Sequence, residues 1–123
     1  MEDNTVLFVE DSPTMRRIIS NSLSRIGFNK VIESENGVDA LAKAEGEDIG
    51  LILTDWNMPE MNGYELVENL RSQDKFKDTP IIMITTRGMQ DDVMNAIKIG
   101  VNGYIVKPFT PKVLEKKIKE VVS

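Results

Sequence analysis

Short runs of consecutive apolar residues alternate along the chain with longer stretches in which apolar residues recur every three or four positions. The first pattern is typical of a strand buried on both faces, and the second is typical of an amphipathic helix. Each apolar run is followed by one helical stretch, so the pattern predicts alternating strands and helices. The expected strands are residues 5–9, 31–32, 51–54, 81–84 and 104–106.

Capping residues indicate where the helices begin and end. Ser12 and Pro13 predict the start of the first helix, because Ser is a good N-cap and Pro is tolerated in the first turn. Gly27 predicts the end of that helix. Asn62 and Glu65 have the spacing of a capping box before the third helix. The remaining helices are expected after Asn36-Gly37, after Gly88 and after Thr110-Pro111.

The apolar faces of these helices are expected to pack on the sheet. In the second helix we expect Val38, Leu41 and Ala44 to face inward, and in the last helix Val113, Leu114, Ile118, Val121 and Val122. Strands that alternate with helices predict an α/β fold with a parallel sheet covered on both faces. The expected fold is a doubly wound five-stranded sheet of order 2-1-3-4-5, which opens a site between its first and third strands.

Composition and charge narrow the class of protein. A length of 123 residues suits one domain, residues 1–123. The chain has no Cys, which excludes disulfides and fits a cytoplasmic location, and no His, which excludes an imidazole base. A net charge of −5 argues against nucleic-acid binding, and no apolar stretch is long enough for a membrane span.

Polar side chains follow four of the five predicted strands. Glu10 and Asp11 follow the first strand, Asp55 the third, Thr85 the fourth and Lys107 the fifth. The carboxyl ends of parallel strands meet at one edge of the sheet, where ligands bind in this class of fold. We therefore expect these five side chains to converge there.

Three converging carboxylates repel one another, by about 4 kcal/mol for each pair at about 4 Å and an effective dielectric constant near 20. Lys107 alone cannot neutralise them, so either some stay protonated or a divalent cation binds, and oxygen ligands of this kind suit Mg²⁺. A solvated acidic loop would explain Glu10 and Asp11, but not Asp55 and Thr85 at matching strand ends. A carboxylate nucleophile, a cation, a hydroxyl and an ammonium together suit phosphoryl transfer.

These motifs resemble those of response-regulator receiver domains, and most of all those of the chemotaxis members of that family. The resemblance covers nearly the whole chain and implies the flavodoxin-like (βα)5 receiver fold. It rests on Glu10-Asp11, on residues 14–18, on Asp55 with residues 56–63, on Thr85 and on Lys107-Pro108-Phe109.

The resemblance implies a role for each group at the predicted site. Asp55 is the expected phosphoacceptor, and Lys107 is expected to bind the phosphoryl group. Thr85 is expected to move toward that group, and Tyr104 to follow from an exposed to an inward rotamer. The bond between Lys107 and Pro108 is expected to be a cis peptide bond.

The metal site is likewise implied by the resemblance. Asp11, Asp55 and the backbone carbonyl of Asn57 are expected to bind Mg²⁺ directly, and Glu10 through a water molecule. Glu10 stands where the family more often has Asp.

Two further positions bear on the phosphorylated state. Thr86 stands where the family often has Ala or Ser, and narrows the path to the phosphoryl group. Asn57 and Arg87 occupy positions that, by resemblance, tune the rate of dephosphorylation.

A partner surface is expected on the fourth helix and the fifth strand. Val93 and Ile97 are one turn apart and would line an exposed strip beside Tyr104 and Val106. The nearby lysines of the last helix are Lys112, Lys116 and Lys119. An apolar strip with lysines at its rim suits an acidic, amphipathic partner segment. The alternative is that the apolar residues are core and the lysines only solvate the helix; the resemblance favours partner binding.

The sequence thus predicts a monomeric, single-domain switch that assists its own phosphorylation and dephosphorylation but is not an enzyme. By resemblance, its partners are a CheA-like histidine kinase, a FliM-like flagellar motor switch protein and a phosphatase. The alternatives are a receiver that acts as a phosphate sink or relay, and a receiver cut from a longer regulator. A phosphohydrolase with an Asp nucleophile and a flavin or nucleotide binder fit less well. A phosphohydrolase of this kind needs a second acid two residues after the nucleophile, where this chain has Asn57. A nucleotide binder needs a Gly-rich loop after the first strand, and this chain has none there.

Overall fold

The computed structural model describes residues 5–28 and 30–122. Its five strands form one parallel sheet in the order β2-β1-β3-β4-β5, as predicted. The strands are β1 (Thr5–Val9), β2 (Lys30–Ser34), β3 (Leu51–Thr54), β4 (Ile81–Thr85) and β5 (Gly103–Val106). The α-helices are α1 (Pro13–Ile26), α2 (Gly37–Glu45), α3 (Gly63–Arg71), α4 (Gln90–Lys98) and α5 (Pro111–Val122), and a short 3-10 helix, η1, spans Asp74–Phe76. Residues 1–4 and 123 of the predicted domain lie outside the described residues.

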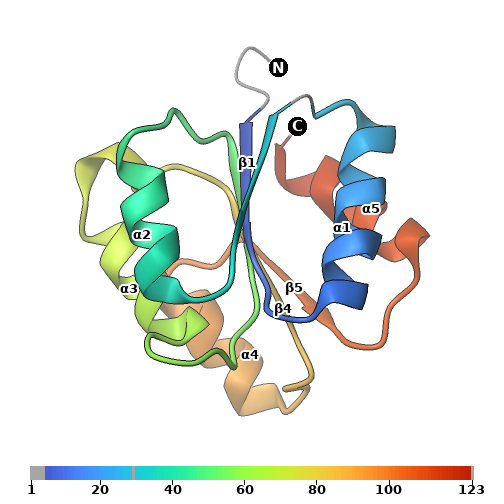
Figure 1. The fold of residues 1–123 in the computed structure, drawn as a ribbon. Coiled ribbons are helices and arrows are strands. Elements are labelled where there is room, and N and C mark those ends of the chain that lie inside the picture. Colours follow the sequence, from blue (N-terminus) through green and yellow to red (C-terminus); the bar gives the residue numbers. More distant parts are fainter. Residues whose placement is uncertain (1–4, 29, 123) are drawn as a thin grey trace.

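Helices cover both faces of the sheet: α1 and α5 lie on one face, and α2, α3 and α4 on the other (Figure 1). Successive strand residues point to opposite faces, so each strand contributes to two cores. In β1, Val6 and Phe8 pack with α1 and α5, whereas Leu7 and Val9 pack with α2 and α3. This two-sided burial explains why the strands are continuous apolar runs in the sequence.

The predicted helix caps are present. Ser12 Oγ accepts a hydrogen bond from the N–H of Met15 at 3.4 Å, and Gly27 ends α1 in the left-handed region with φ of 110°. Asn62 and Glu65 form the reciprocal capping box of α3, with hydrogen bonds of 2.9 and 3.1 Å. These local contacts are readable from the sequence because both partners lie within one turn.

Two predicted inward positions are wrong. Val38 is 50% exposed, because the buried side of α2 is formed by Gly37, Ala40 and Ala44, with Leu41 half-buried. Val38 lies one residue, or about 100° of helix rotation, from that side. Val113 is 47% exposed for the same reason. The buried side of α5 follows Leu114 and Ile118, and Val121 and Val122 pack partly against the core.

The sequence pattern also predicts one strand too short and does not predict the 3-10 helix. The second strand runs from Lys30 to Ser34, longer than the predicted residues 31–32, and lies at an edge of the sheet as expected. The helical turn η1 is not predicted, yet its Phe76 is only 1% exposed. Across the described ranges, no helix combines the length and apolar character that crossing a membrane requires.

Candidate functional site

Strand register brings the predicted site residues to one edge of the sheet. Val9 pairs with Thr54, so Glu10 and Asp55, the next residue of each chain segment, emerge side by side. Backbone hydrogen bonds continue the sheet here, from the N–H of Asp55 to the carbonyl of Val9 at 3.1 Å. At β4 and β5, the N–H of Lys107 donates to the carbonyl of Thr85 at 2.8 Å.

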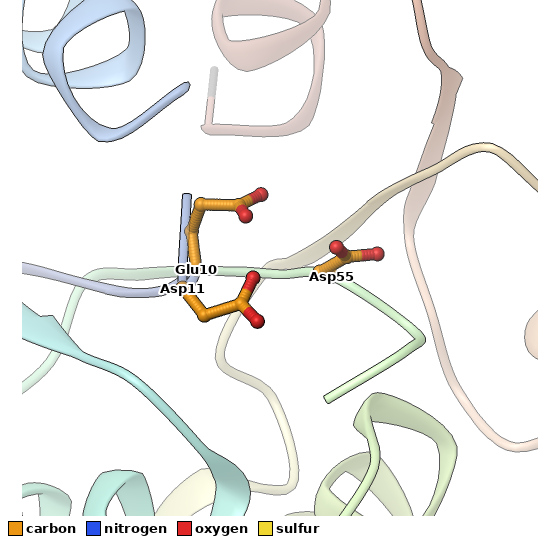
Figure 2. Close-up of side chains that lie close together, drawn as sticks. All are labelled: Glu10, Asp11 and Asp55. Carbon is orange, nitrogen blue, oxygen red and sulfur yellow. The ribbon is translucent and has the colours of Figure 1, made fainter. Parts of the chain in front are cut away.

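Three carboxylates converge at this edge. One oxygen each of Glu10, Asp11 and Asp55 lies within 4.8 Å of the others. In Figure 2, Glu10 and Asp11 leave the same segment and reach toward the side on which Asp55 lies. Glu10 and Asp55 are buried, with 2% and 9% exposure, whereas Asp11 is exposed. The cluster therefore opens to solvent at Asp11.

Lys107 bridges two of these carboxylates. Its Nζ lies 2.8 Å from Glu10 Oε1 and 3.1 Å from Asp55 Oδ2. Burial disfavours the charged ammonium, but the hydrogen bonds and charges of Glu10 and Asp55 outweigh it and raise the pKa of Lys107. Lys107 thus stays protonated beside its two partners. Its bond to Pro108 is cis, as expected.

The donor set fits a divalent cation. One ammonium faces three carboxylates, which leaves an excess of negative charge in a small space. Asp11 makes no hydrogen bond or ion pair with any residue in the part of the chain that the structure describes, so its oxygens remain available. Hard oxygen ligands with one open, solvated side are the environment in which Mg²⁺ binds while keeping several waters.

Glu10 is held by contacts that the sequence pattern does not reveal. Its Oε2 accepts a hydrogen bond from the N–H of Ser12 at 3.0 Å. Its backbone carbonyl accepts one from Arg16 Nε at 2.7 Å. Hydrophobic periodicity contains no signal for either contact, because both depend on how the loop after β1 folds back on α1.

Asp55 is held by the loop that follows it. Its Oδ1 accepts hydrogen bonds from the N–H groups of Trp56 at 2.6 Å and Asn57 at 3.4 Å. The predicted metal ligand Asn57 therefore has its backbone beside the Asp55 carboxylate. The N–H of Gly63 closes this loop by donating to the carbonyl of Trp56 at 2.8 Å.

Thr85, Arg87 and Tyr104 are linked beside the cluster. Thr85 is fully buried, and its Oγ1 accepts a hydrogen bond from the N–H of Arg87 at 3.3 Å. The Tyr104 hydroxyl donates to the carbonyl of Arg87 at 2.6 Å, and the Tyr104 side chain is half-buried. Burial and the nearby charge of Asp92 raise the pKa of Tyr104. Among the described residues, no hydrogen bond joins Thr85 to Asp55.

The predicted partner strip is only partly buried. Ile97 is 58% exposed and Val106 is 42% exposed, so the alternative that they belong to the core is wrong for these two residues. Val93 is half-buried, while Lys116 and Lys119 are exposed. Three further apolar side chains of this region are exposed: Met89, which precedes α4, Met94 of α4 and Val113 of α5.

The fold and this acidic site define the class of protein. Residues 6–119 match the family described as the response regulator receiver domain, and the chain belongs to that family. More particularly, it is similar to chemotaxis regulators. The chemotaxis protein CheY1 of Helicobacter pylori is 55% identical over 119 residues, which are 96% of each chain.

Solved structures agree with this assignment. The chemotaxis response regulator CheY4 of Vibrio cholerae superposes with a TM-score of 0.89 at 38% identity, over 95% of this chain and 97% of that one. The receiver domain of a sensor histidine kinase from Pseudomonas aeruginosa, solved with a magnesium ion coordinated in its active site cleft, superposes with a TM-score of 0.86. The two sequences are 30% identical, and the match covers 96% of each chain. The chain is thus a CheY-like receiver domain, and the resemblance predicted from its motifs is confirmed.

Proposed function

We propose that the chain is a chemotaxis switch in which Asp55 accepts a phosphoryl group from a histidine kinase. The observation that carries this proposal is the cluster of three carboxylates, two of which, Glu10 and Asp55, are bridged by Lys107. The buried Asp55 accepts hydrogen bonds from the Lys107 ammonium at one carboxylate oxygen and from backbone N–H groups at the other. We further propose that residues 1–123 act as one monomeric domain in the cytoplasm.

The two oxygens of Asp55 are not equivalent. Oδ1 accepts two backbone hydrogen bonds, whereas Oδ2 faces Lys107. Oδ2 is therefore the oxygen that attacks phosphorus. As the new O–P bond forms, the bond from phosphorus to the donor nitrogen breaks and its electron pair stays on the kinase imidazole. The product is an acyl phosphate on Asp55.

The neighbouring groups stabilise the transferred phosphoryl group. Lys107 already contacts the attacking oxygen and would pair with a phosphoryl oxygen. Thr85 Oγ1 accepts a hydrogen bond from Arg87, which leaves its own proton for another phosphoryl oxygen. Glu10, Asp11, Asp55 and the Asn57 carbonyl would hold Mg²⁺, which neutralises negative charge on the reacting groups. The Pseudomonas aeruginosa receiver domain that coordinates magnesium supports this choice of ion.

The output is binding of a partner on the face formed by α4, β5 and α5. Ile97 and Val106 offer apolar surface there, and Lys116 and Lys119 offer positive charge. This combination suits an acidic, amphipathic helix or strand. The similarity to chemotaxis regulators points to a flagellar motor switch protein of the FliM kind, with a CheA-like kinase as the phosphodonor.

Intact-mass measurement after incubation with acetyl phosphate tests the proposal. We expect the wild type to gain one phosphoryl group only when Mg²⁺ is present, and Asp55→Asn to gain none. Asp48→Asn serves as the matched control, because Asp48 is an exposed carboxylate outside the acidic cluster. A gain that survives Asp55→Asn, or no gain in the wild type, would refute the proposal.

A further inference from the structure

Arg87 lies in the loop between β4 and α4, and its side chain reaches the loop that carries Asp55. Its guanidinium carbon lies 4.6 Å from the centre of the Trp56 ring. Its Nε donates a hydrogen bond to Asn57 Oδ1 at 3.3 Å. Trp56 and Asn57 directly follow Asp55, so the Arg87 side chain rests on the segment that any change at Asp55 would move first.

The same residue also contacts the output side of the domain. Its Nη1 lies 3.4 Å from Asp92 Oδ1 in the first turn of α4. Its backbone carbonyl holds the Tyr104 hydroxyl at 2.6 Å, and its N–H donates to Thr85. Arg87 thus connects the loop after Asp55, the first turn of α4 and the Tyr104 ring through direct contacts.

The chemistry of arginine explains why one side chain can make these contacts together. Its planar guanidinium donates in several fixed directions and stacks on an aromatic face, whereas a lysine ammonium is a single point charge. The ring of Trp56 and the amide of Asn57 hold one side of the group, and Asp92 holds another. These contacts restrain the Arg87 main chain, and therefore the carbonyl that receives the Tyr104 hydroxyl.

We propose that Arg87 is a positioning residue that couples the state of Asp55 to Tyr104 and α4. This inference rests on the proposed phosphorylation of Asp55. A phosphoryl group there adds negative charge next to Trp56 and Asn57, and a nearby anion attracts the guanidinium away from Asp92. Such a shift moves the carbonyl that binds Tyr104.

The test uses two reporters in the full chain. Trp56 is the only Trp, so its fluorescence reports binding of beryllium fluoride, a phosphoryl analogue, in the presence of Mg²⁺. With Tyr64→Phe as background, Tyr104 is the only Tyr, and incorporation of 3-fluorotyrosine gives one ¹⁹F NMR signal. We expect both signals to change in the parent protein when beryllium fluoride is added.

In Arg87→Ala we expect the midpoint of the beryllium fluoride titration, followed by Trp56 fluorescence, to stay within about threefold of the parental midpoint. The shift of the Tyr104 ¹⁹F signal should fall below half of the parental shift. Midpoints are compared because loss of the cation above Trp56 alters the baseline fluorescence. We expect Arg87→Lys to restore the shift only in part, and Asp92→Asn, which leaves the Trp56 contact in place, to reduce it. Arg25→Ala is the matched control, because Arg25 is an exposed arginine paired with Glu115 at 2.7 Å and lies away from the site.

The outcomes separate the inference from the proposed function. An undiminished Tyr104 shift in Arg87→Ala, full rescue by Arg87→Lys, or an equal loss in Arg25→Ala overturns the inference. A Trp56 response without any Tyr104 shift in the parent protein also overturns it, but leaves phosphorylation of Asp55 standing. No Trp56 response in the parent protein contradicts the proposed function itself.

Discussion

Lys107 Nζ lies 3.1 Å from Asp55 Oδ2, although the strands that these two residues follow are not neighbours in the sheet. Asp55 follows β3 and Lys107 follows β5, and β4 lies between them in the sheet. The contact joins residues 52 positions apart in the chain. The lysine side chain therefore spans the end of β4, where Thr85 lies, and sets the electrostatic balance of the acidic cluster.

Replacing Lys107 by Met is expected to lower both stability and phosphorylation. The Lys107 side chain is only 14% exposed, and its loss leaves Glu10 and Asp55 without their shared cation. We expect the free energy of unfolding to fall by about 1–3 kcal/mol, less than for a fully buried pair. Urea unfolding in EDTA measures this loss, and added Mg²⁺ should recover part of it. Lys107→Arg, which keeps the charge, should be less affected; equal losses in both variants would contradict the electrostatic explanation.

Replacing Asp11 by Asn is expected to stabilise the protein when no divalent cation is present. Asp11 is exposed and adds a third negative charge without an ion pair among the described residues. Relief of repulsion should raise the melting temperature in EDTA by a few degrees, which corresponds to roughly 1 kcal/mol. The same variant should lose most of the stabilisation that Mg²⁺ gives the wild type. A lower melting temperature in EDTA would argue against repulsion within the cluster.

Replacing Gly63 by Ala is expected to displace the loop after β3. A Cβ at this position would overlap the carbonyl oxygen of Asp55 and lie 3.0 Å from the Cα of Trp56. These are backbone atoms that cannot move independently of Asp55, the proposed phosphoacceptor, so we expect slower phosphorylation and a loss of stability of about 1–3 kcal/mol. Gly46→Ala is the matched control, because a Cβ there meets nothing within 4 Å. Wild-type behaviour of Gly63→Ala would show that the loop adapts.

The ionisation of Tyr104 is expected to respond to Asp92. Burial and the Asp92 charge raise the pKa of Tyr104, so in Tyr64→Phe its tyrosinate absorbance should appear above the ordinary midpoint near pH 10. A raised pKa stabilises the folded state fully below that ordinary value, and the contribution is lost as pH rises through the folded-state pKa. Asp92→Asn should move the midpoint to lower pH. An unchanged midpoint in the variant, with the fold intact by circular dichroism, would contradict this assignment.

Replacing Ile97 by Asp is expected to weaken partner binding without affecting phosphorylation. Ile97 is 58% exposed, so a charge there should change the free energy of unfolding by no more than about 0.5 kcal/mol. Binding of the phosphorylated protein to an acidic motor-switch peptide should weaken at least tenfold. Val38→Asp is the matched control, because Val38 is 50% exposed on α2, away from the proposed partner face. Equal weakening by both variants would place the partner elsewhere.

The order of strands and helices, and the sheet edge at which Glu10, Asp11 and Asp55 meet, could be predicted from the sequence alone. Strands buried on both faces need continuous apolar residues, and helix caps need particular residues within one turn, so both leave local patterns. Asp55 could be singled out because it directly follows such a strand. The roles assigned to Thr85, Tyr104 and the metal ligands remain predictions.

The buried side of each helix and the contacts between residues far apart in the chain could be identified only in the folded protein. Val38 and Val113 were misplaced because a short helix offers two neighbouring apolar sides, and packing on the sheet selects one of them. The reach of Lys107 across β4 and the contacts of Arg87 with Trp56 and Asp92 have no local pattern at all. Such contacts depend on loop paths and long, flexible side chains, whose positions follow from the packed sheet and not from periodicity along the chain.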